Sequence, residues 1–275
     1  MRLPPLILIH GYPLDHTMWH SVVGELSEKT KVFAPDLPGF GDNPVEIAEP
    51  SIDQMADDIA ELFELHNLTQ AVVAGMSMGG YVALSFAQRH KERLAGLALI
   101  STQANADLPE NQRARRELIE KVRHDGPTRA SEAILPRLFS AANRDNPALA
   151  QFAIEGSKRA GVEGICWALE AMARRPDRNA VLKSLTVPAS VIHGAEDQIV
   201  PAERARTMAQ WIPNATYVEI PGAGHATPLE AGEKVAEALL ELLQRSAAFL
   251  ASHPPCDENS RHRPGIIWSP TERGL

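Results

Sequence analysis

A serine flanked by glycines is the strongest chemical motif of the chain. The sequence GMSMGG occupies residues 75–80, between an apolar run that ends at Ala74 and a helical pattern that begins at Tyr81. A serine at a sharp strand-to-helix turn has a strained backbone, and glycines are needed where a neighbouring side chain would collide. The turn exposes the hydroxyl group, so Ser77 is a candidate nucleophile. The alternative is a glycine-rich turn whose serine has no chemical role.

A serine hydroxyl needs a base to remove its proton and a carboxylate to fix the tautomer of that base. His225 ends the stretch PGAGH and Asp197 ends the stretch HGAED, and each stretch follows or completes a short apolar run. Ligands of an open parallel sheet bind beyond the carboxyl ends of its strands, where all three residues are expected. Glu196 is a direct rival of Asp197, which could also be an ordinary turn acid. His193 ends a predicted strand and is expected to be a hydrogen-bonded structural histidine.

Acyl transfer also needs two N–H donors aimed at the oxygen that becomes negative. Met78, the residue after the candidate nucleophile, offers one backbone N–H. The second is expected after the first apolar run, in the sequence HGYP, where Tyr12 is the candidate donor and Gly11 permits close approach. Read alone, this sequence could be an ordinary strand end.

Short apolar runs closed by turn residues predict the elements that hold these groups. Such runs are typical of strands buried on both faces of a parallel sheet. Helical patterns lie between them, which implies crossover connections and helices on both faces of the sheet. We therefore predict an α/β fold with a mostly parallel central sheet. The predicted strands are 6–9, 32–34, 71–74, 97–100, 189–193 and, more weakly, 217–220.

The alternation of strands and helices stops between residues 105 and 183, where only helical patterns occur. We predict a helical cap there, inserted between two parts of one core domain, 1–104 and 184–250. Its helices are expected near 109–125, 130–139, 147–159 and 162–175. The last helical pattern of the chain begins near Pro228 and weakens after Leu243, and residues 251–275 are predicted to be an extended or disordered tail.

Composition narrows the class of protein. A chain of 275 residues with a net charge of −8 can bury a large core and is poorly suited to bind nucleic acid. The apolar run near the N-terminus is too short for a membrane span or a signal peptide. Cys166 and Cys256 have no metal-ligand spacing and form no disulfide framework. We predict a cytoplasmic protein with no membrane partner and no bound metal, either a monomer or a homodimer.

Five motifs in the order of this chain resemble those of the α/β-hydrolase superfamily. They are HGYPLDHTMW, DLPGFGDN, GMSMGG, HGAEDQIVP and GAGHATPLE. The resemblance extends from Leu6 to Leu243 and is greatest to small esterases, enol-lactonases, carbon-carbon bond hydrolases and cofactor-free haloperoxidases. It implies an α/β-hydrolase fold, a triad of Ser77, Asp197 and His225, oxyanion donors at Tyr12 and Met78, and no organic cofactor. Epoxide hydrolases and haloalkane dehalogenases carry an aspartate at the serine position, which disfavours those activities.

The activity that these features predict is hydrolysis of a small carboxylic ester or lactone through an acyl-enzyme on Ser77. The same residues could serve carbon-carbon bond hydrolysis, lyase or perhydrolase chemistry, and a non-catalytic binding protein is a remote alternative. Arg113, Arg115 and Arg116 could attract an acidic substrate or form a solvated helix face. Four apolar side chains are candidates for the pocket wall, although they could equally pack the cap onto the core. They are Trp19, Phe139, Trp167 and Met172.

Overall fold

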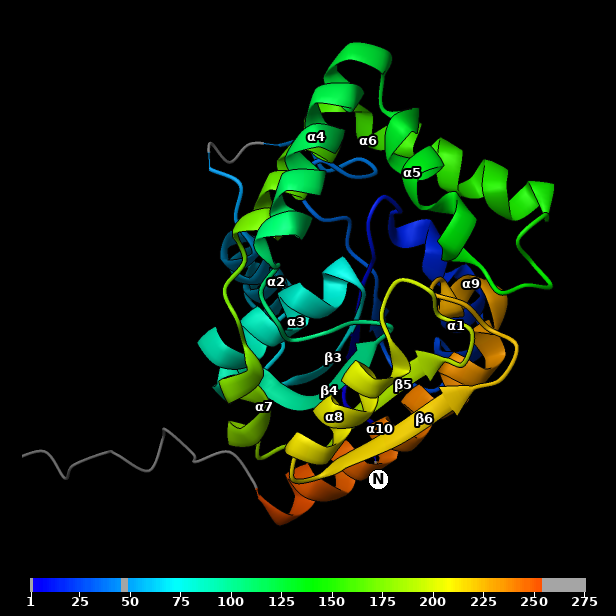
Figure 1. The fold of residues 1–275 in the computed structure, drawn as a ribbon. Helices are drawn as coiled ribbons and strands as arrows, with labels where there is room; N and C mark the ends of the chain where they lie inside the picture. Colours follow the sequence, from blue (N-terminus) through cyan, green and yellow to red (C-terminus); the bar gives the residue numbers. More distant parts are fainter. Residues whose placement is uncertain (1, 46–48, 254–275) are drawn as a thin grey trace, which may run out of the picture.

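A computed structural model of the chain describes residues 2–45 and 49–253. Six strands form one sheet in the order β2-β1-β3-β4-β5-β6, and every neighbouring pair is parallel. Helices cover both faces of this sheet, as Figure 1 shows. The strands are β1 (Leu6–Ile9), β2 (Val32–Phe33), β3 (Ala71–Met76), β4 (Leu94–Ile100), β5 (Ala189–Gly194) and β6 (Ala215–Ile220).

The helices alternate with the strands except in the middle of the chain. In the first half they are η1 (His16–Trp19), α1 (His20–Leu26), α2 (Ile52–Leu65), α3 (Met78–Arg89) and η2 (Lys91–Arg93). Four follow β4 without an intervening strand: α4 (Pro109–Asp125), α5 (Thr128–Leu138), α6 (Pro147–Arg174) and α7 (Asn179–Ser184). The last are α8 (Ala202–Trp211), α9 (Thr227–Glu230) and α10 (Gly232–Ser252). None of the described helices is long and apolar enough to span a membrane.

Alternate residues of each strand enter the cores on opposite faces of the sheet. In β1, Ile7 and Ile9 pack in the core formed with α2, α3 and α8, whereas Leu6 and Leu8 pack in the core formed with α1 and α10. Because side chains alternate across a strand, covering both faces requires an uninterrupted apolar run. The predicted parallel sheet with helices on both faces is therefore confirmed.

The helices α4, α5 and α6 pack against one another and lie together above the sheet in Figure 1. Helix α6 contains a kink at Gly161, whose φ of 64° and ψ of −178° are not helical. The two predicted helices 147–159 and 162–175 correspond to its two halves. Helix α7 packs against α3 and α8 instead. We therefore propose that the cap consists of α4 to α6 and ends before α7.

The last helix is longer than the sequence pattern predicts. The pattern weakens after Leu243, but α10 continues to Ser252 with Ser246 and Ala247 buried. Small residues continue the buried face because α10 lies close to β4 at Gly96, where a Cβ atom would be 2.3 Å from Ser246 Oγ. Within the predicted tail, residues 254–275 lie outside the described residues.

Candidate active site

Ser77 occupies the sharp turn between β3 and α3, with a φ of 52° and a ψ of −112°. Few residues other than glycine adopt a positive φ, so the surrounding packing must enforce this conformation. A Cβ atom on Gly75 would lie 2.0 Å from the carbonyl oxygen of Gly79, and one on Gly79 would lie 2.2 Å from that of Ile9. The two glycines thus allow β1, β3 and the first turn of α3 to meet at the serine.

Hydrogen bonds connect the three residues of the predicted triad. His225 Nε2 lies 2.9 Å from Ser77 Oγ, and His225 Nδ1 lies 2.8 Å from Asp197 Oδ2. The other carboxylate oxygen of Asp197 accepts from the backbone N–H groups of Ile199 and Val200, at 2.8 and 2.9 Å. An ionised carboxylate only accepts hydrogen bonds, so Nδ1 of His225 carries a proton and Nε2 can accept the serine proton.

The carboxylate of Asp197 is fully buried but remains readily ionised. Burial alone would raise its pKa, yet the adjacent His225 ring and the N–H donors hold the pKa below the ordinary aspartate value. A buried anion beside a histidine stabilises the imidazolium that a histidine forms when it takes up a proton.

His193 lies on the other side of Asp197, with its Nδ1 atom 3.8 Å from Asp197 Oδ2. The ring is buried, and neither nitrogen has a hydrogen-bond partner within residues 2–45 and 49–253. The expectation of a hydrogen-bonded structural histidine is therefore wrong. Burial lowers the pKa of His193, which keeps the ring uncharged near neutral pH.

Glu196, the rival of Asp197, points to a different part of the molecule. Its Oε2 atom accepts a hydrogen bond of 2.8 Å from the backbone N–H of Ala141, in the segment after α5. The geometry therefore favours Asp197 as the partner of His225.

The predicted oxyanion donors flank the serine. A Cβ atom on Gly11 would lie 2.4 Å from Met76 Sδ, so the absence of a side chain lets the loop after β1 approach the end of β3. His10 anchors this loop because its Nε2 atom accepts a hydrogen bond of 2.9 Å from Leu37 N–H. In the described part of the chain, the backbone N–H groups of Tyr12 and Met78 donate to no protein acceptor. Both are available to a ligand, and their oxyanion role remains a prediction.

A cavity of about 430 Å³ opens beside Ser77 and His225. Its walls come from the loops after β1, β4, β5 and β6, from the turn at Ser77 and from α3 to α6. Of the four predicted wall residues, Met172 lines this cavity. Arg115, one of the three arginines considered for an acidic substrate, also lines it, whereas Arg113 and Arg116 are not among its lining residues. Residues that the sequence did not indicate include Tyr81, Leu169, Ile199 and Val200.

The structure does not bring the other three predicted wall residues to this cavity. Trp19 and Phe139 are fully buried in the core beneath α1 and α10. Trp167 lines a separate groove that includes residues of α4 and α6. Large apolar side chains occur both in cores and in pockets. Here these three side chains are part of the packed protein and do not line the cavity beside Ser77.

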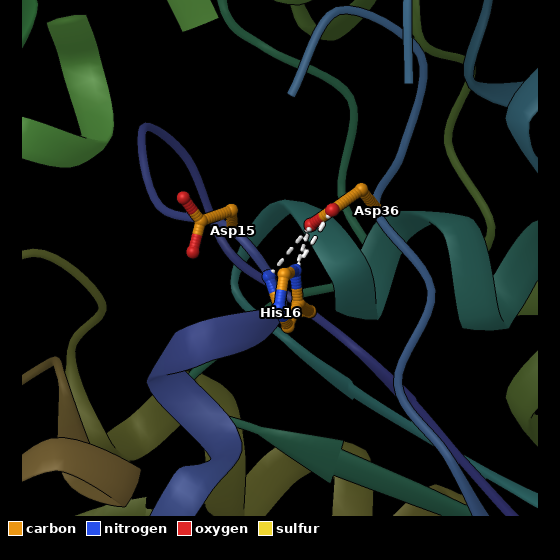
Figure 2. A group of neighbouring side chains, drawn as sticks. All are labelled: Asp15, His16 and Asp36. Atoms are coloured by element: carbon orange, nitrogen blue, oxygen red, sulfur yellow. Dashed lines mark hydrogen bonds and ion pairs between the residues drawn. The ribbon is translucent and has the colours of Figure 1, made fainter. Parts of the chain in front are cut away.

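Asp15, His16 and Asp36 form a second polar cluster, drawn in Figure 2, in which one possible ligand atom of each lies within 4.8 Å of the others. Each group already has protein partners. His16 Nδ1 lies 2.8 Å from Asp36 Oδ2, and Asp15 Oδ2 accepts a hydrogen bond of 2.6 Å from Arg159 Nε. The cluster therefore connects the segment around η1 to α6 and to the loop after β2.

A parallel sheet with a serine at a strand-to-helix turn and a histidine beside it is the architecture of an α/β hydrolase. The chain belongs to the α/β hydrolase family, because residues 4–231 match the family described as alpha/beta hydrolase fold.

Curated relatives include hydrolases of different chemistry. The chain is 30% identical over 252 residues to a pimeloyl-[acyl-carrier protein] methyl ester esterase of Chromobacterium violaceum, covering 89% of this chain and 96% of that protein. It is 30% identical over 260 residues to a 2-hydroxymuconate semialdehyde hydrolase of Pseudomonas sp. strain CF600, covering 90% and 89%. It is 29% identical to the dihydrolipoyllysine-residue acetyltransferase component of the acetoin cleaving system of Pseudomonas putida. This match covers 88% of this chain but spans only 64% of that protein.

Among solved structures, a thermophilic esterase from Thermogutta terrifontis, determined with malate bound, superimposes with a TM-score of 0.85. The two sequences are 40% identical, and the match covers 88% of this chain and 90% of the esterase. These comparisons establish the family and leave the substrate open between esters and carbon-carbon bonds.

Proposed function

We propose that the protein is a serine hydrolase that cleaves a small carboxylic ester or lactone through an acyl-enzyme on Ser77. The observation that carries this proposal is the pair of hydrogen bonds that joins Ser77 to His225 and His225 to Asp197 beside the cavity. A serine within reach of a base, and a base oriented by a buried carboxylate, is the arrangement that nucleophilic acyl transfer requires. The similarity to two named esterases supports the ester as substrate.

In the proposed reaction, Ser77 Oγ attacks the acyl carbon while its proton moves to His225 Nε2. The negative carbonyl oxygen accepts hydrogen bonds from the N–H groups of Tyr12 and Met78. The carbon–oxygen bond of the ester then breaks, and the alcohol leaves with the proton held by His225. A water molecule next gives its proton to His225 and attacks the acyl carbon, which releases the acid and restores Ser77. With a lactone, the alcohol formed in the first step stays attached to the acyl chain, and the second step releases a single hydroxy acid.

Carbon-carbon bond hydrolysis is the second candidate, supported by the 30% identity to the 2-hydroxymuconate semialdehyde hydrolase. In that reaction the bond that breaks lies between the attacked carbon and a carbon leaving group, which must be protonated. Parallel assays of a p-nitrophenyl ester, a lactone and 2-hydroxymuconate semialdehyde separate these candidates by the product released.

The direct experiment compares hydrolysis of p-nitrophenyl butyrate by the parent protein and by Ser77→Ala. The variant is expected to lose at least about 10³-fold in kcat, since removing a triad nucleophile removes most of the rate enhancement. Ser27→Ala changes an exposed serine at the end of α1 and is the matched control. Equal turnover by Ser77→Ala and the parent protein would contradict the proposal.

A further inference from the structure

The cavity beside Ser77 is lined by three cationic and two anionic side chains. The chain as a whole has a net charge of −8, so the sign of the cavity lining is opposite to that of the protein. A concave site of one sign concentrates ligands of the other sign. The charged lining residues are Arg115, Lys121, Arg137, Asp107 and Glu117.

The charges around Asp107, which lines this cavity, are not balanced. Asp107 is buried and binds two guanidinium groups: its Oδ2 atom lies 2.6 Å from Arg115 Nε, and its Oδ1 atom lies 2.7 Å from Arg175 Nη1. One carboxylate between two arginines leaves an excess positive charge. Uncompensated charge is costly in a partly buried site, so a mobile anion would be stabilised there.

The two arginines differ in how their donors are used. Arg175 donates to the carbonyl oxygens of Met172 and Asn105, and its guanidinium lies over the Tyr81 ring at 4.0 Å. Arg115 donates through Nε to Asp107, and its Nη1 atom meets only the sulfur of Met172, at 3.5 Å. Thioether sulfur is a weak acceptor, and Nη2 of Arg115 has no acceptor in the described part of the chain. Arg115 thus keeps a pair of donors whose spacing suits a carboxylate.

A second unpartnered donor lies in the same cavity wall. The hydroxyl of Tyr12 is buried and has no hydrogen-bond partner among the described residues. Burial raises the pKa of Tyr12, so the hydroxyl keeps its proton and can donate. A buried hydroxyl without a partner is unfavourable, and a ligand oxygen would remove that penalty.

We infer that the Arg115 guanidinium and the Tyr12 hydroxyl bind an ionised carboxylate of the substrate. The substrate class is then an ester that carries a second carboxylate, such as a half-ester of a dicarboxylic acid. This inference rests on the proposed ester hydrolysis and specifies its substrate. Lys121 and Arg137 are exposed and line the same cavity, where they add to the attraction for an anion.

The test compares acidic esters with neutral esters of the same shape. In the first pair the carboxylate or amide is on the acyl side. The mono-p-nitrophenyl ester of adipic acid is compared with the p-nitrophenyl ester of adipamic acid. In the second pair the carboxylate or amide is on the alcohol side, and 4-carboxyphenyl butyrate is compared with 4-carbamoylphenyl butyrate. The parent protein is expected to prefer the acid over the amide by at least about tenfold in kcat/KM in one of the pairs. No preference in either pair would overturn the inference.

Variants of Arg115 assign the preference to this residue. Arg115→Gln is expected to reduce the ratio of kcat/KM for the acid to that for the amide about tenfold, and Arg115→Lys should retain part of it. Arg113→Gln changes an exposed arginine of the same helix and should leave the ratio unchanged. Tyr12→Phe removes only the hydroxyl and should reduce the ratio. An unchanged ratio in Arg115→Gln contradicts the role of Arg115.

A binding measurement separates this inference from the proposed function. Calorimetric titration of adipate into Ser77→Ala is expected to show binding that weakens about tenfold in the double variant with Arg115→Gln. If adipate does not bind Ser77→Ala, or binds the double variant equally well, while the parent protein still hydrolyses neutral esters, the carboxylate site alone is overturned. If Ser77→Ala hydrolyses esters as fast as the parent, the proposed function fails, whereas adipate binding still tests Arg115. Urea unfolding of Arg115→Gln checks that the variant is folded.

Discussion

The Nδ1 atom of His193 lies 3.8 Å from the Oδ2 atom of Asp197, the oxygen that also faces His225. Because His193 is buried without a hydrogen-bond partner among the described residues, burial lowers its pKa. His10 is also fully buried, and burial likewise lowers its pKa despite a hydrogen bond with the Gly11 carbonyl. Two histidines of this kind make the stability of the protein sensitive to mild acid.

The first prediction concerns this acid sensitivity. In the unfolded chain a histidine binds its proton near pH 6.5, whereas in the folded protein these two bind it only at lower pH. The unfolded state therefore holds more protons over this interval, and the free energy of unfolding decreases as the pH falls below about 6.5. Urea midpoints at pH 7.5 and 5.5 measure the decrease, which should be smaller in His193→Gln. His20→Gln, at an exposed histidine, should keep the full decrease. A parent midpoint that is the same at both pH values contradicts this prediction.

The turn that carries Ser77 should not tolerate a side chain at Gly79. A Cβ atom there would lie 2.2 Å from the Ile9 carbonyl oxygen and 2.6 Å from that of His10, so backbone must move. We expect Gly79→Ala to reduce the free energy of unfolding by about 2 kcal/mol or more, as overpacking does. Gly24→Ala is the control, because nothing lies within 4 Å of its Cβ position and alanine favours the helix by up to about 1 kcal/mol. Equal urea midpoints for the two variants would refute the packing argument.

Replacing the carboxylate behind His225 should slow catalysis without unfolding the protein. Asp197→Asn changes the group that orients Nδ1 of His225, and we expect kcat to fall about 10⁴-fold, as when a triad histidine has the wrong tautomer. Glu196→Gln should stay within about threefold of the parent, because Glu196 instead accepts from Ala141 N–H. Steady-state kinetics with p-nitrophenyl butyrate measures both variants. A larger loss in Glu196→Gln than in Asp197→Asn would reverse the assignment.

The ion pair between Arg159 and Asp15 should stabilise the contact between α6 and the segment that begins η1. Burial alone would raise the pKa of Asp15, but hydrogen bonds from Arg159 and Thr17 bring the pKa below its ordinary value. Arg159→Gln leaves this carboxylate buried without its cation, and we expect the free energy of unfolding to fall by about 1–2 kcal/mol. The loss is moderate because Arg159 itself is partly exposed. Lys158→Gln breaks an exposed pair with Glu155 and should leave the free energy of unfolding nearly unchanged. Urea unfolding at pH 7.5 compares them, and equal losses would contradict the prediction.

The sheet could be predicted from the sequence because strands buried on both faces leave continuous apolar runs. The predicted run at 97–100 is too short, since β4 begins at Leu94. Gly96 has little strand propensity, and it is strand here because Val72 of β3 pairs with it and α10 packs beside it. The position of Gly96 in the sheet, and not its local sequence preference, therefore determines that it is part of a strand.

The residues around Ser77 could be predicted in part. Ser77, Asp197 and His225 each follow a strand of one parallel sheet, so the order of the strands determines where they meet. The pocket wall could not be predicted in the same way, because an aromatic residue such as Phe139 has the same sequence signal in a core or a pocket. Arg115 is one of three neighbouring arginines that the sequence offers for an acidic substrate, and its spacing distinguishes it from the other two. It lies four and seven residues before Ile119 and Val122, the buried residues of α4. A charged residue on an apolar helix face indicates a buried partner or a ligand.

The most direct test of the central claim is the mass of the peptide containing Ser77 after treatment with a fluorophosphonate at pH 7.5. The folded protein is expected to carry one adduct on Ser77, because only an activated serine reacts readily with this reagent. His225→Ala should slow the labelling by at least about 10²-fold, and urea-unfolded protein should remain unlabelled. A folded protein whose Ser77 peptide stays unmodified, or whose adduct lies on another residue, would contradict the claim that Ser77 is the nucleophile.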